Sequence, residues 1–481
     1  MTKLAFDFPD KALFVRLFGG DVYAVGGCVR DLILGRPSAE VDLLVARHPL
    51  DEIVRKLEKH GRVDLVGKSF GIIKLGIHGR IYDIALPRTD RAGVEGTRSH
   101  KDIVVAADPG LPVEKDLERR DFRTNSMALR LKDGTIIDPF EGRKDTLAKR
   151  IRLTNPAAFP DDPLRVVRVA RFASVLGFKV DPSIYPAARA VDLAGLSVER
   201  VNDEMFKLLL DSPRPSVGLE EMFRLGVLDQ WFPELQALAL VIQDSVFHPE
   251  QDAFGHHTVW AHTKLCVDQA ATLGRAPGLP TPKRLALLLA ALYHDLGKTT
   301  TTRWEYKRGR MAVTSCGHDI QSERAARRVL SRFKVQTWNG TPIGRMVPLL
   351  IRTHHRAGEL WTNREEVTKK AFNRLAADVQ GEIELVVLLD AADRAGRGAR
   401  LVRGLDKQAR WLFKKFDELR VNRETIKPLV MGRDLIKLGV PPGPEMGRIL
   451  KKLYKSQIDN GFETKAAGLE RARRLIERTT P

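Results

Sequence analysis

The chain of 481 residues contains little cysteine and no long hydrophobic run. Its three cysteines, Cys28, Cys266 and Cys316, are too few and too widely spaced for a disulfide framework or a CxxC zinc site. No segment reaches the roughly 18 consecutive apolar residues that a membrane-spanning helix needs. Asp7 and Asp10 lie where an export signal would need an apolar stretch. These absences favour a cytoplasmic protein that does not bind membranes.

Acidic residues are also fewer than basic residues. Asp and Glu number 61 against 80 for Lys and Arg, which leaves a formal charge of +19 and a sequence pI near 9.9. A surplus of this size favours a polyanionic partner such as nucleic acid. Hydrophobic residues make up 43% and charged residues 29% of the chain, which is typical of a folded protein and excludes a disordered chain, a collagen or a coiled-coil rod. No internal repeat is evident, so a solenoid is excluded as well.

The pattern of elements changes along the chain. Short β-branched segments separated by Gly or Pro fill the first 150 residues or so, whereas a 3.6-residue periodicity dominates from about Asp161 to the end. The sequence therefore predicts an α+β fold class, in which a small mixed β-sheet head precedes all-helical domains. The predicted boundaries separate a head, a middle helical domain, a histidine-rich helical domain and a basic helical tail, at residues 1–150, 151–245, 246–400 and 401–481.

A glycine pair marks the first candidate binding element. Gly26 and Gly27 follow an apolar strand and open a helical pattern that carries Arg30. Paired glycines at such a turn let backbone N–H groups approach a phosphate at the start of the helix. The turn is therefore predicted to lie at a phosphate group.

Two acidic residues follow on the next predicted strand. Because side chains alternate along a strand, Glu40 and Asp42 share one face, and two carboxylates on one face can hold Mg²⁺ for phosphoryl transfer. Asp83 lies on a later strand and would complete a cluster of three carboxylates. Taken alone, acids at this spacing more often form a solvated strand face.

The surrounding motifs favour the metal-binding interpretation. Together they resemble the bacterial tRNA nucleotidyltransferase and poly(A) polymerase family, the class II branch of the polymerase β-like nucleotidyltransferases. The motifs follow in the family's order: GGCVRDLILG (26–35) with the acid-x-Asp pair, KDLERRDFRTNSMA (115–128), IIDPFEGRKDTLAKRIRLTN (136–155) and AFPDDPLRVVRVARFASVLGF (158–178). The resemblance implies a polymerase β-like head at 1–150 whose acid-x-Asp pair, Glu40 and Asp42, binds the catalytic metals.

The acid-x-Asp pair departs from the family pattern at one position. Glu40 stands where the family usually has Asp, and its extra methylene moves the carboxylate by about 1.5 Å, roughly one C–C bond. That distance is large beside a metal–ligand tolerance of about 0.2 Å. Either the backbone compensates for the longer side chain or the activity is weakened.

The resemblance also implies a set of nucleotide-binding residues. Guanidinium groups suit phosphate oxygens and an amide suits a sugar hydroxyl, while Asp and Arg together can imitate a Watson–Crick edge and so select CTP or ATP without a template. A salt-bridged surface is the alternative for the arginines, and helix-capping acids followed by solvated arginines are the alternative for the acids. The predicted set is Gly26, Gly27, Arg30, Arg119, Arg120, Asp121, Asn125, Asp161, Asp162, Arg165, Arg168 and Arg171. A later element at 199–204 is expected to brace the nucleotide-binding helix.

Histidines gather in the third segment. The stretch ALYHDLGK (291–298) ends an apolar run and resembles the HD phosphohydrolase signature. Imidazole and carboxylate ligands suit Mn²⁺, Fe²⁺, Ni²⁺ or Zn²⁺, whose bound water can attack a phosphate ester. The predicted metal ligands are His262, His294, Asp295, His318, His354, His355 and Asp393. His256 and His257 are either further ligands or loop residues.

Basic residues recur after the histidine-rich segment. They would form one stripe on a single helix and could follow a phosphate backbone, although a solvated face is the alternative. They are Arg394, Arg397, Arg400, Arg403, Lys407, Arg410 and Lys414. The stretch 429–462 resembles the closing module of HD-bearing members of the family, which implies that residues 401–481 hold the body of tRNA.

The sequence as a whole predicts a template-independent RNA nucleotidyltransferase that adds CCA to tRNA 3′ ends from CTP and ATP. Mg²⁺ would be held by Glu40 and Asp42 with Asp83, and the HD segment would add a phosphohydrolase activity. The alternatives are an A-adding enzyme or poly(A) polymerase, an HD metal phosphohydrolase with a non-catalytic RNA-binding head, and an RNA-binding module without chemistry. The predicted partners are tRNA or other RNA 3′ ends.

Overall fold

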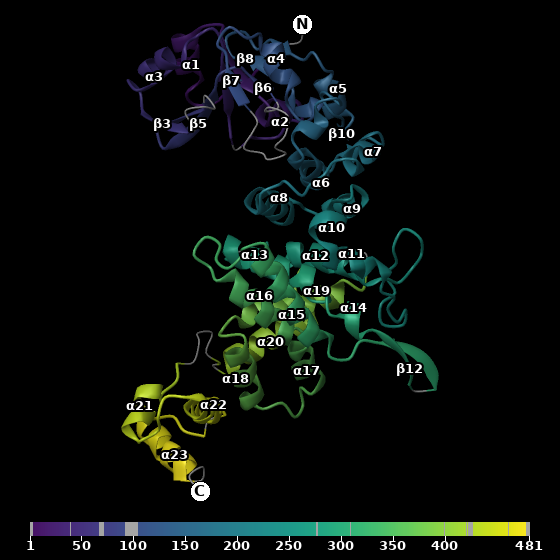
Figure 1. Cartoon of the computed structure of the whole chain (residues 1–481), viewed down its shortest axis with the longest axis vertical. Coiled ribbons are helices and arrows are strands. Elements are labelled where there is room, and N and C mark those ends of the chain that lie inside the picture. Colours follow the sequence, from purple (N-terminus) through teal and green to yellow (C-terminus); the bar gives the residue numbers. More distant parts are fainter. Residues whose placement is uncertain are drawn as a thin grey trace. The chain divides into compact units, whose positions relative to one another are not determined.

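The computed structural model describes residues 3–38, 40–66, 72–91, 104–275, 278–307, 309–398, 400–419, 421, 427–459 and 461–477. The chain forms two compact units, Met1–Phe232 and Pro233–Pro481, with the mixed sheet in the first and helices throughout the second (Figure 1). This order of elements confirms the predicted α+β class. Among the described residues, no helix has the length and apolar character needed to cross a bilayer.

The head of the first unit contains a seven-stranded sheet with the strand order β3-β4-β5-β2-β1-β8-β9. Neighbouring strands are antiparallel, except that β2 and β5 run parallel and place Asp42 opposite Asp83. The strands are β1 (Val22–Val25), β2 (Asp42–Val45), β3 (Arg62–Val66), β4 (Ile72–Ile77), β5 (Arg80–Ala85), β8 (Ala128–Arg130) and β9 (Ile136–Ile137).

Helices cover both faces of this sheet. Helices α1 (Lys11–Phe18), α2 (Gly27–Ile33) and α3 (Leu50–Leu57) share one hydrophobic core with alternate residues of the central strands. Helix α4 (Val113–Glu118) packs on the opposite face, against Tyr23 and Val25 of β1. Because both faces are covered, every residue of β1 is buried, and this strand is apolar throughout rather than alternating.

The remainder of the first unit is helical. Its elements are η2 (Arg123–Asn125), α5 (Gly142–Leu147), η3 (Phe159–Asp161), α6 (Leu164–Leu176), α7 (Ile184–Arg189), α8 (Val198–Asp211), α9 (Pro215–Arg224) and α10 (Val227–Trp231), with the short pairs β6 (Arg88–Arg91) with β7 (Val104–Ala107) and β10 (Arg150–Ile151) with β11 (Lys179–Val180). Helix α6 starts after Pro163 and ends at Gly177, which adopts a left-handed conformation with φ 70°. It packs between α8 and α9, and this leaves its arginine-bearing face toward the head's pocket.

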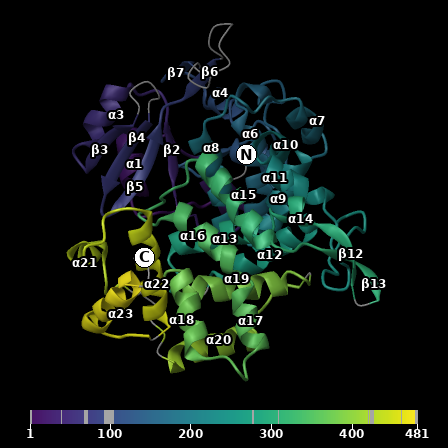
Figure 2. The same cartoon turned by 60° about the horizontal axis from the view of Figure 1, so that its bottom comes forward.

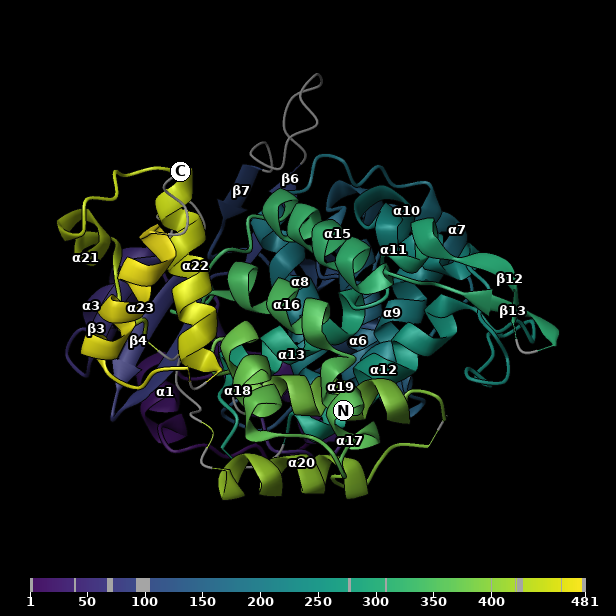
Figure 3. The same ribbon diagram turned by 90° about the horizontal axis from the view of Figure 1, so that it is seen from below.

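The second unit is a helical body from which one hairpin extends. Its elements are α11 (Pro233–Gln236), η4 (Ala237–Leu240), α12 (Val259–Leu273), α13 (Thr281–Tyr293), α14 (Lys298–Thr301), β12 (Arg303–Lys307), β13 (Arg310–Thr314), α15 (His318–Arg332), α16 (Ile343–Thr353), α17 (Arg356–Thr362), α18 (Lys369–Asp378), α19 (Ile383–Ala395), α20 (Lys407–Glu418), α21 (Gly432–Lys437), α22 (Pro444–Ile458) and α23 (Lys465–Glu477). Helices α12, α16 and α19 surround α13 (Figure 2), so every residue from Leu285 to Tyr293 is buried. The last three helices pack around a small core of their own (Figure 3).

The predicted basic stripe on one helix is wrong. Helix α19 ends at Ala395 and α20 begins at Lys407, so the seven basic residues are divided between two helices and the segment that joins them. Gln269 holds this segment by donating to the carbonyls of Ala395 and Arg400. Gly396 follows the last residue of α19 and lies against Cys266 of α12, where a Cβ would stand 3.0 Å from the Cys266 backbone nitrogen. Sequence periodicity alone could not reveal this close approach.

Candidate active sites and metal centre

The head and α6 enclose a pocket of about 720 Å³. Its lining carries eight basic and five acidic side chains, which makes it a cationic site with a local cluster of acids. The lining residues are Gly26, Gly27, Arg30, Glu40, Asp42, Arg88, Arg119, Arg120, Asp121, Asn125, Asp162, Arg165, Arg168, Arg171, Phe172, Lys207 and Asp211. The pocket therefore brings together all the residues predicted to bind the nucleotide or its metal except Asp83 and Asp161.

Gly26 makes room for one of the pocket arginines. Its φ of 74° lies in the left-handed region, and a Cβ at this position would stand 2.9 Å from the Arg120 Nη1 atom. Beside it, Arg30 is buried and donates to Asn125 Oδ1 at 2.7 Å. A side chain at position 26 would thus displace the Arg120 guanidinium from the pocket.

The acidic cluster lies at the start of β2. Glu40 and Asp42 both line the pocket, whereas Asp83 accepts from Lys74 Nζ at 2.7 and 3.0 Å through its two carboxylate oxygens. Withdrawal from solvent raises the pKa of Asp42, and the charges of Asp83 and Glu40 add to this rise, while Arg120 opposes it. Such mutually repelling carboxylates are suited to a divalent cation, so the donor set fits Mg²⁺.

Asp116 organises two of the arginines and was missed in the sequence. Its side chain is fully buried, and Oδ1 accepts from Arg119 at 2.8 Å while Oδ2 accepts from Arg120 at 3.1 Å. Burial acts to raise the pKa of Asp116, but the charges of Arg120 and Arg119 outweigh it and hold the pKa below its ordinary value. The signal was the spacing of three and four residues from Asp116 to the two arginines that follow α4, which places both beside the acid.

Replacing Asp116 with asparagine should loosen both arginines. Removing one partner from a buried pair costs about 3 kcal/mol, because Arg119 and Arg120 stay charged without a counterion. Since folding lowers the pKa of Asp116, the wild-type advantage should be complete above about pH 4 and shrink as the pH falls through the native pKa. Hydrogen exchange of the α4 amides between pH 5 and pH 3 measures this difference. The exposed variant Asp64→Asn is the control, and an equal difference at both pH values would contradict the assignment.

A second acid, Asp121, is bound to α6. Its Oδ2 accepts from Arg168 at 2.6 and 2.9 Å, and its Oδ1 accepts from Asn125 at 3.0 Å. Glu204, from the element expected to brace this helix, accepts from Arg168 at 3.3 Å and from Arg171 at 2.5 Å. Asp121 and Glu204 therefore connect Arg168, Arg171 and Asn125 in one network along the pocket wall, which restrains both guanidinium groups.

Of the three residues predicted to select the base, two line the pocket and one does not. Arg165 lines the pocket and donates to the carbonyls of Ala158 and Arg119 at 2.6 and 2.7 Å, which fixes its guanidinium plane. Asp162 also lines the pocket, and Arg200 lies 3.2 Å from its Oδ1. Asp161 is exposed in η3 and does not line the pocket.

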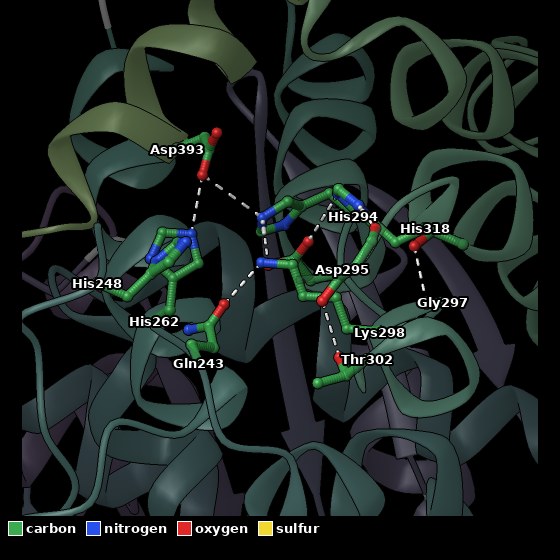
Figure 4. A network of polar contacts seen from close by, with 12 residues as sticks. Gln243, His248, His262, His294, Asp295, Gly297, Lys298, Thr302, His318 and Asp393 are labelled. Carbon is green, nitrogen blue, oxygen red and sulfur yellow. Dashed lines mark hydrogen bonds and ion pairs between the residues drawn. The ribbon is translucent and has the colours of Figure 1, made fainter. Parts of the chain in front are cut away.

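The second unit contains a cluster of histidines and acids at its centre (Figure 4). His262 from α12 places Nε2 2.8 Å from Asp393 Oδ1 on α19. His294, at the end of α13, places Nε2 3.7 Å from the same oxygen and 3.2 Å from Asp295 Oδ2. His318 Nε2 lies 3.4 Å from Asp295 Oδ1. The tertiary structure thus brings together residues separated by more than 130 positions in the chain.

Three histidines of this cluster are oriented in the same way. The Nδ1 atoms of His294, His318 and His354 lie 2.9, 2.7 and 2.6 Å from the backbone carbonyl three residues earlier. Donation from Nδ1 leaves Nε2 as the lone-pair nitrogen, and this nitrogen points into the cluster. The Nε2 atoms of His294 and His354 are buried without a hydrogen bond, as expected for ligands of a cation.

The electrostatics of the cluster also fit a divalent metal. Burial lowers the pKa of His294, but Asp295 and Asp393 outweigh it and raise the pKa to about 10, so the site attracts positive charge. Burial and the neighbouring His355 and His294 hold the pKa of His354 well below its ordinary value, which keeps the imidazole neutral as metal binding requires. Ligand atoms of His262, His294 and Asp393 lie within 4.8 Å of one another, and so do those of His318, His354 and His355.

Glu250 and His248 were missed in the sequence. Glu250 Oε1 lies 2.8 Å from His262 Nδ1 and 2.9 Å from His248 Nδ1. This carboxylate therefore orients His262 through its Nδ1 atom, as backbone carbonyls orient the other histidines of the cluster. The signal was an HPE segment immediately before the histidine-rich loop. His256 and His257 lie in this loop and make contacts outside the cluster, with Asp252 and with the Glu250 carbonyl.

Comparison with known proteins finds three family matches along the chain. The poly(A) polymerase head domain family matches residues 22–152, the probable RNA- and SrmB-binding site of polymerase A matches 177–238, and the HD domain matches 259–397. The multifunctional CCA protein of Alcanivorax borkumensis is 36% identical over 71% of this chain and 76% of its own length. That of Methylococcus capsulatus is 33% identical over 90% of this chain and 92% of its own length.

Solved structures show the same fold. The CCA-adding enzyme of Bacillus stearothermophilus in complex with CTP superposes with a TM-score of 0.59 at 23% identity, covering 97% of each chain. The Thermotoga maritima CCA-adding enzyme complexed with tRNA_CCA superposes with a TM-score of 0.53 at 20% identity, covering 98% of this chain and 96% of that one.

Proposed function

Because this chain belongs to the family of multifunctional CCA proteins, we propose that it is a template-independent RNA nucleotidyltransferase that adds CCA to tRNA 3′ ends from CTP and ATP. The observation that carries the proposal is the single pocket in which Glu40 and Asp42 face a wall of fixed arginines. A nucleoside triphosphate is the ligand that such a pocket suits, because it requires both a divalent cation and cationic side chains.

The carboxylates would hold the cation. We propose Glu40 and Asp42 as its ligands and Asp83 as a third carboxylate, which Lys74 now neutralises. Divalent metal dependence follows from the family, and Mg²⁺ bound here would polarise the α-phosphate and lower the pKa of the RNA 3′-hydroxyl.

The arginines would bind and orient the nucleotide. Asp116 holds Arg119 and Arg120 where they can neutralise a triphosphate, and Arg30 holds the Asn125 amide where it can bond a ribose hydroxyl. These groups are held before the substrate arrives, so binding costs little reorganisation. Gly26 and Gly27 would let the phosphates approach the backbone.

The base would be chosen at the start of α6. We propose that Asp162 and Arg165 bond the edges of CTP and ATP, with Asp161 beside them, because Asp162 and Arg165 line the pocket with acceptor and donor groups. Arg168 and Arg171 are bound by Asp121 and Glu204, so they would act by fixing this wall as well as by contacting phosphates.

The cluster in the second unit would carry a second activity. We propose a metal phosphohydrolase in which His262, His294, Asp295 and Asp393, with His318, His354 and His355, hold Mn²⁺, Fe²⁺, Ni²⁺ or Zn²⁺. The metal would supply an activated water for attack on a phosphate ester. Lys298, 2.8 Å from Asp295 Oδ2, would fix the orientation of that carboxylate. Since tRNA is the proposed substrate of the head, we propose that both activities are exercised in the cytoplasm.

Extension of defined tRNA ends tests the principal activity. With Mg²⁺, CTP and ATP, the chain should convert tRNAs ending before CCA, after C and after CC to the same CCA end, resolved at single-nucleotide resolution. Addition of A to the CC-ended tRNA alone would instead indicate an A-adding enzyme, and long A tails would indicate a poly(A) polymerase. No extension of any of the three tRNAs would contradict the proposed function.

A further inference from the structure

The hairpin β12–β13 presents an uncovered aromatic face. In its register Trp304 pairs with Val313 and Tyr306 with Met311, and paired residues of an antiparallel hairpin share one face. Trp304 and Tyr306 are 65% and 73% exposed, and Met311 is 53% exposed. Large aromatic side chains are usually buried, so an exposed pair on one strand indicates a contact surface.

The opposite face of the hairpin is basic. Arg303, Lys307 and Arg310 are exposed there. Glu305 pairs with both Arg303 and Lys307 at 2.6 Å, and Arg310 Nη2 lies 2.9 Å from Asp244 Oδ2. Three cations thus share two acids, and the face keeps one net positive charge. An apolar partner protein would leave this charge uncompensated, whereas a polyanion would neutralise it.

The hairpin is attached directly to the metal cluster. Its first strand follows α14, which begins at Lys298, and its second strand leads to His318 (Figures 1 and 4). Thr302 and Ser315 close its base with a hydroxyl contact of 2.8 Å. A strand of ligand bound along the hairpin would therefore have one end beside the cluster.

We propose that the aromatic face of β12–β13 binds the single-stranded 3′ end of an RNA by base stacking and presents that end to the metal cluster. Trp304 and Tyr306 stand two residues apart on one strand, about 7 Å, and aromatic side chains on a sheet face stack bases in this way. The basic residues supply the attraction for the backbone, as in other proteins that bind single strands. The proposal rests on the proposed phosphohydrolase and adds the surface that would hold the RNA end.

Photo-crosslinking tests the surface without relying on catalysis. A short single-stranded RNA containing 4-thiouridine, added to the full chain, should crosslink to peptides from residues 302–316. The double variant Trp304→Ala, Tyr306→Ala should lower this crosslinking by about tenfold or more, since each stacked base contributes strongly to binding. Trp304→Phe with Tyr306→Phe should retain it, and Leu240→Ala, which trims an exposed side chain outside the hairpin, should have no effect.

Hydrolysis then tests the link to the metal cluster. The substrates are an RNA with a 2′,3′-cyclic phosphate end and the small ester bis(p-nitrophenyl) phosphate. In both, water adds to phosphorus, one P–O bond breaks, and the leaving oxygen takes the proton, so no other reactant is required. The double alanine variant should raise KM for the RNA by about tenfold and leave the small ester unchanged.

The outcomes separate this proposal from the proposed function. Wild-type protein that hydrolyses neither substrate but crosslinks through residues 302–316 would contradict the phosphohydrolase and support the RNA surface. Crosslinks confined to other segments would overturn the proposal. It would also be overturned if the double alanine variant changed the sedimentation of the protein but not its crosslinking, which would identify a self-association surface.

Discussion

Replacing Asp42 with alanine is expected to abolish nucleotide addition, with a loss of at least about 10³-fold in kcat/KM. A bound metal stabilises the charge of the transition state by several kcal/mol, and each 1.36 kcal/mol corresponds to tenfold in rate, so loss of a ligand carries a cost of this order. Asp42 is expected to matter more than Asp83, because Asp42 lines the pocket while Asp83 is paired with Lys74. Labelled CTP incorporation into a tRNA that lacks CCA gives the measurement.

Two further variants make this result specific. Asp42→Asn keeps the shape of the side chain and should be nearly as inactive, which assigns the effect to charge. Asp64→Ala removes an exposed acid of β3 in the same head and should retain full activity. The phosphohydrolase activity of Asp42→Ala should equal that of the wild type. Incorporation by Asp42→Ala at the wild-type rate would show that the metal is held elsewhere.

The opposite separation is expected for His294→Ala. This change removes a buried ε nitrogen that points at Asp393 and Asp295, so bound divalent metal and phosphohydrolase activity should both be lost, the activity by at least about 10³-fold. Nucleotide addition should stay within about twofold of the wild type, which also shows that the chain has folded. Metal content after dialysis and hydrolysis of bis(p-nitrophenyl) phosphate give the two measurements.

A graded series around His294 distinguishes ligands from supporting residues. Glu250→Gln keeps the size of the side chain but removes the charge that orients His262, so metal affinity should fall by about 10–100-fold without being lost. His256→Ala removes an exposed imidazole outside the cluster and should change neither metal content nor rate. Retention of stoichiometric metal by His294→Ala would exclude this histidine as a ligand.

Local motifs predicted most residues of the two candidate sites, because the residue types and spacings that suggest their chemistry lie within short segments. The glycine pair stands at the start of α2, Asp42 begins β2 with Glu40 just before it, and the element at 161–165 leads into α6, so each motif lies at the beginning of a regular element. The mixed-sheet head and the helical domains were likewise predicted, since strand and helix periodicities differ clearly along this chain.

Supporting residues were harder to predict than ligands. Glu250 acts on His262, which it meets only in the folded protein. Asp116 pairs with Arg119 and Arg120 three and four residues away, but the same spacing is common among surface ion pairs. The exposure of Trp304 and Tyr306 could not be predicted from the sequence either, because alternating aromatics usually indicate a half-buried strand. The prediction of one basic stripe was wrong because the spacing of basic residues does not reveal that α19 ends at Ala395 and α20 begins at Lys407.

The sequence by itself determined the family and the fold class and predicted the candidate reactive groups, because these depend on residue type and on spacing within short segments. Only the tertiary structure decided which carboxylates enter the pocket, which are neutralised by a lysine or an arginine, and which histidine nitrogen faces the cluster. Those outcomes depend on contacts between residues far apart in the chain, such as Asp42 with Asp83 and His262 with Asp393. Register, burial and hydrogen bonding set these contacts only when the strands and helices have packed.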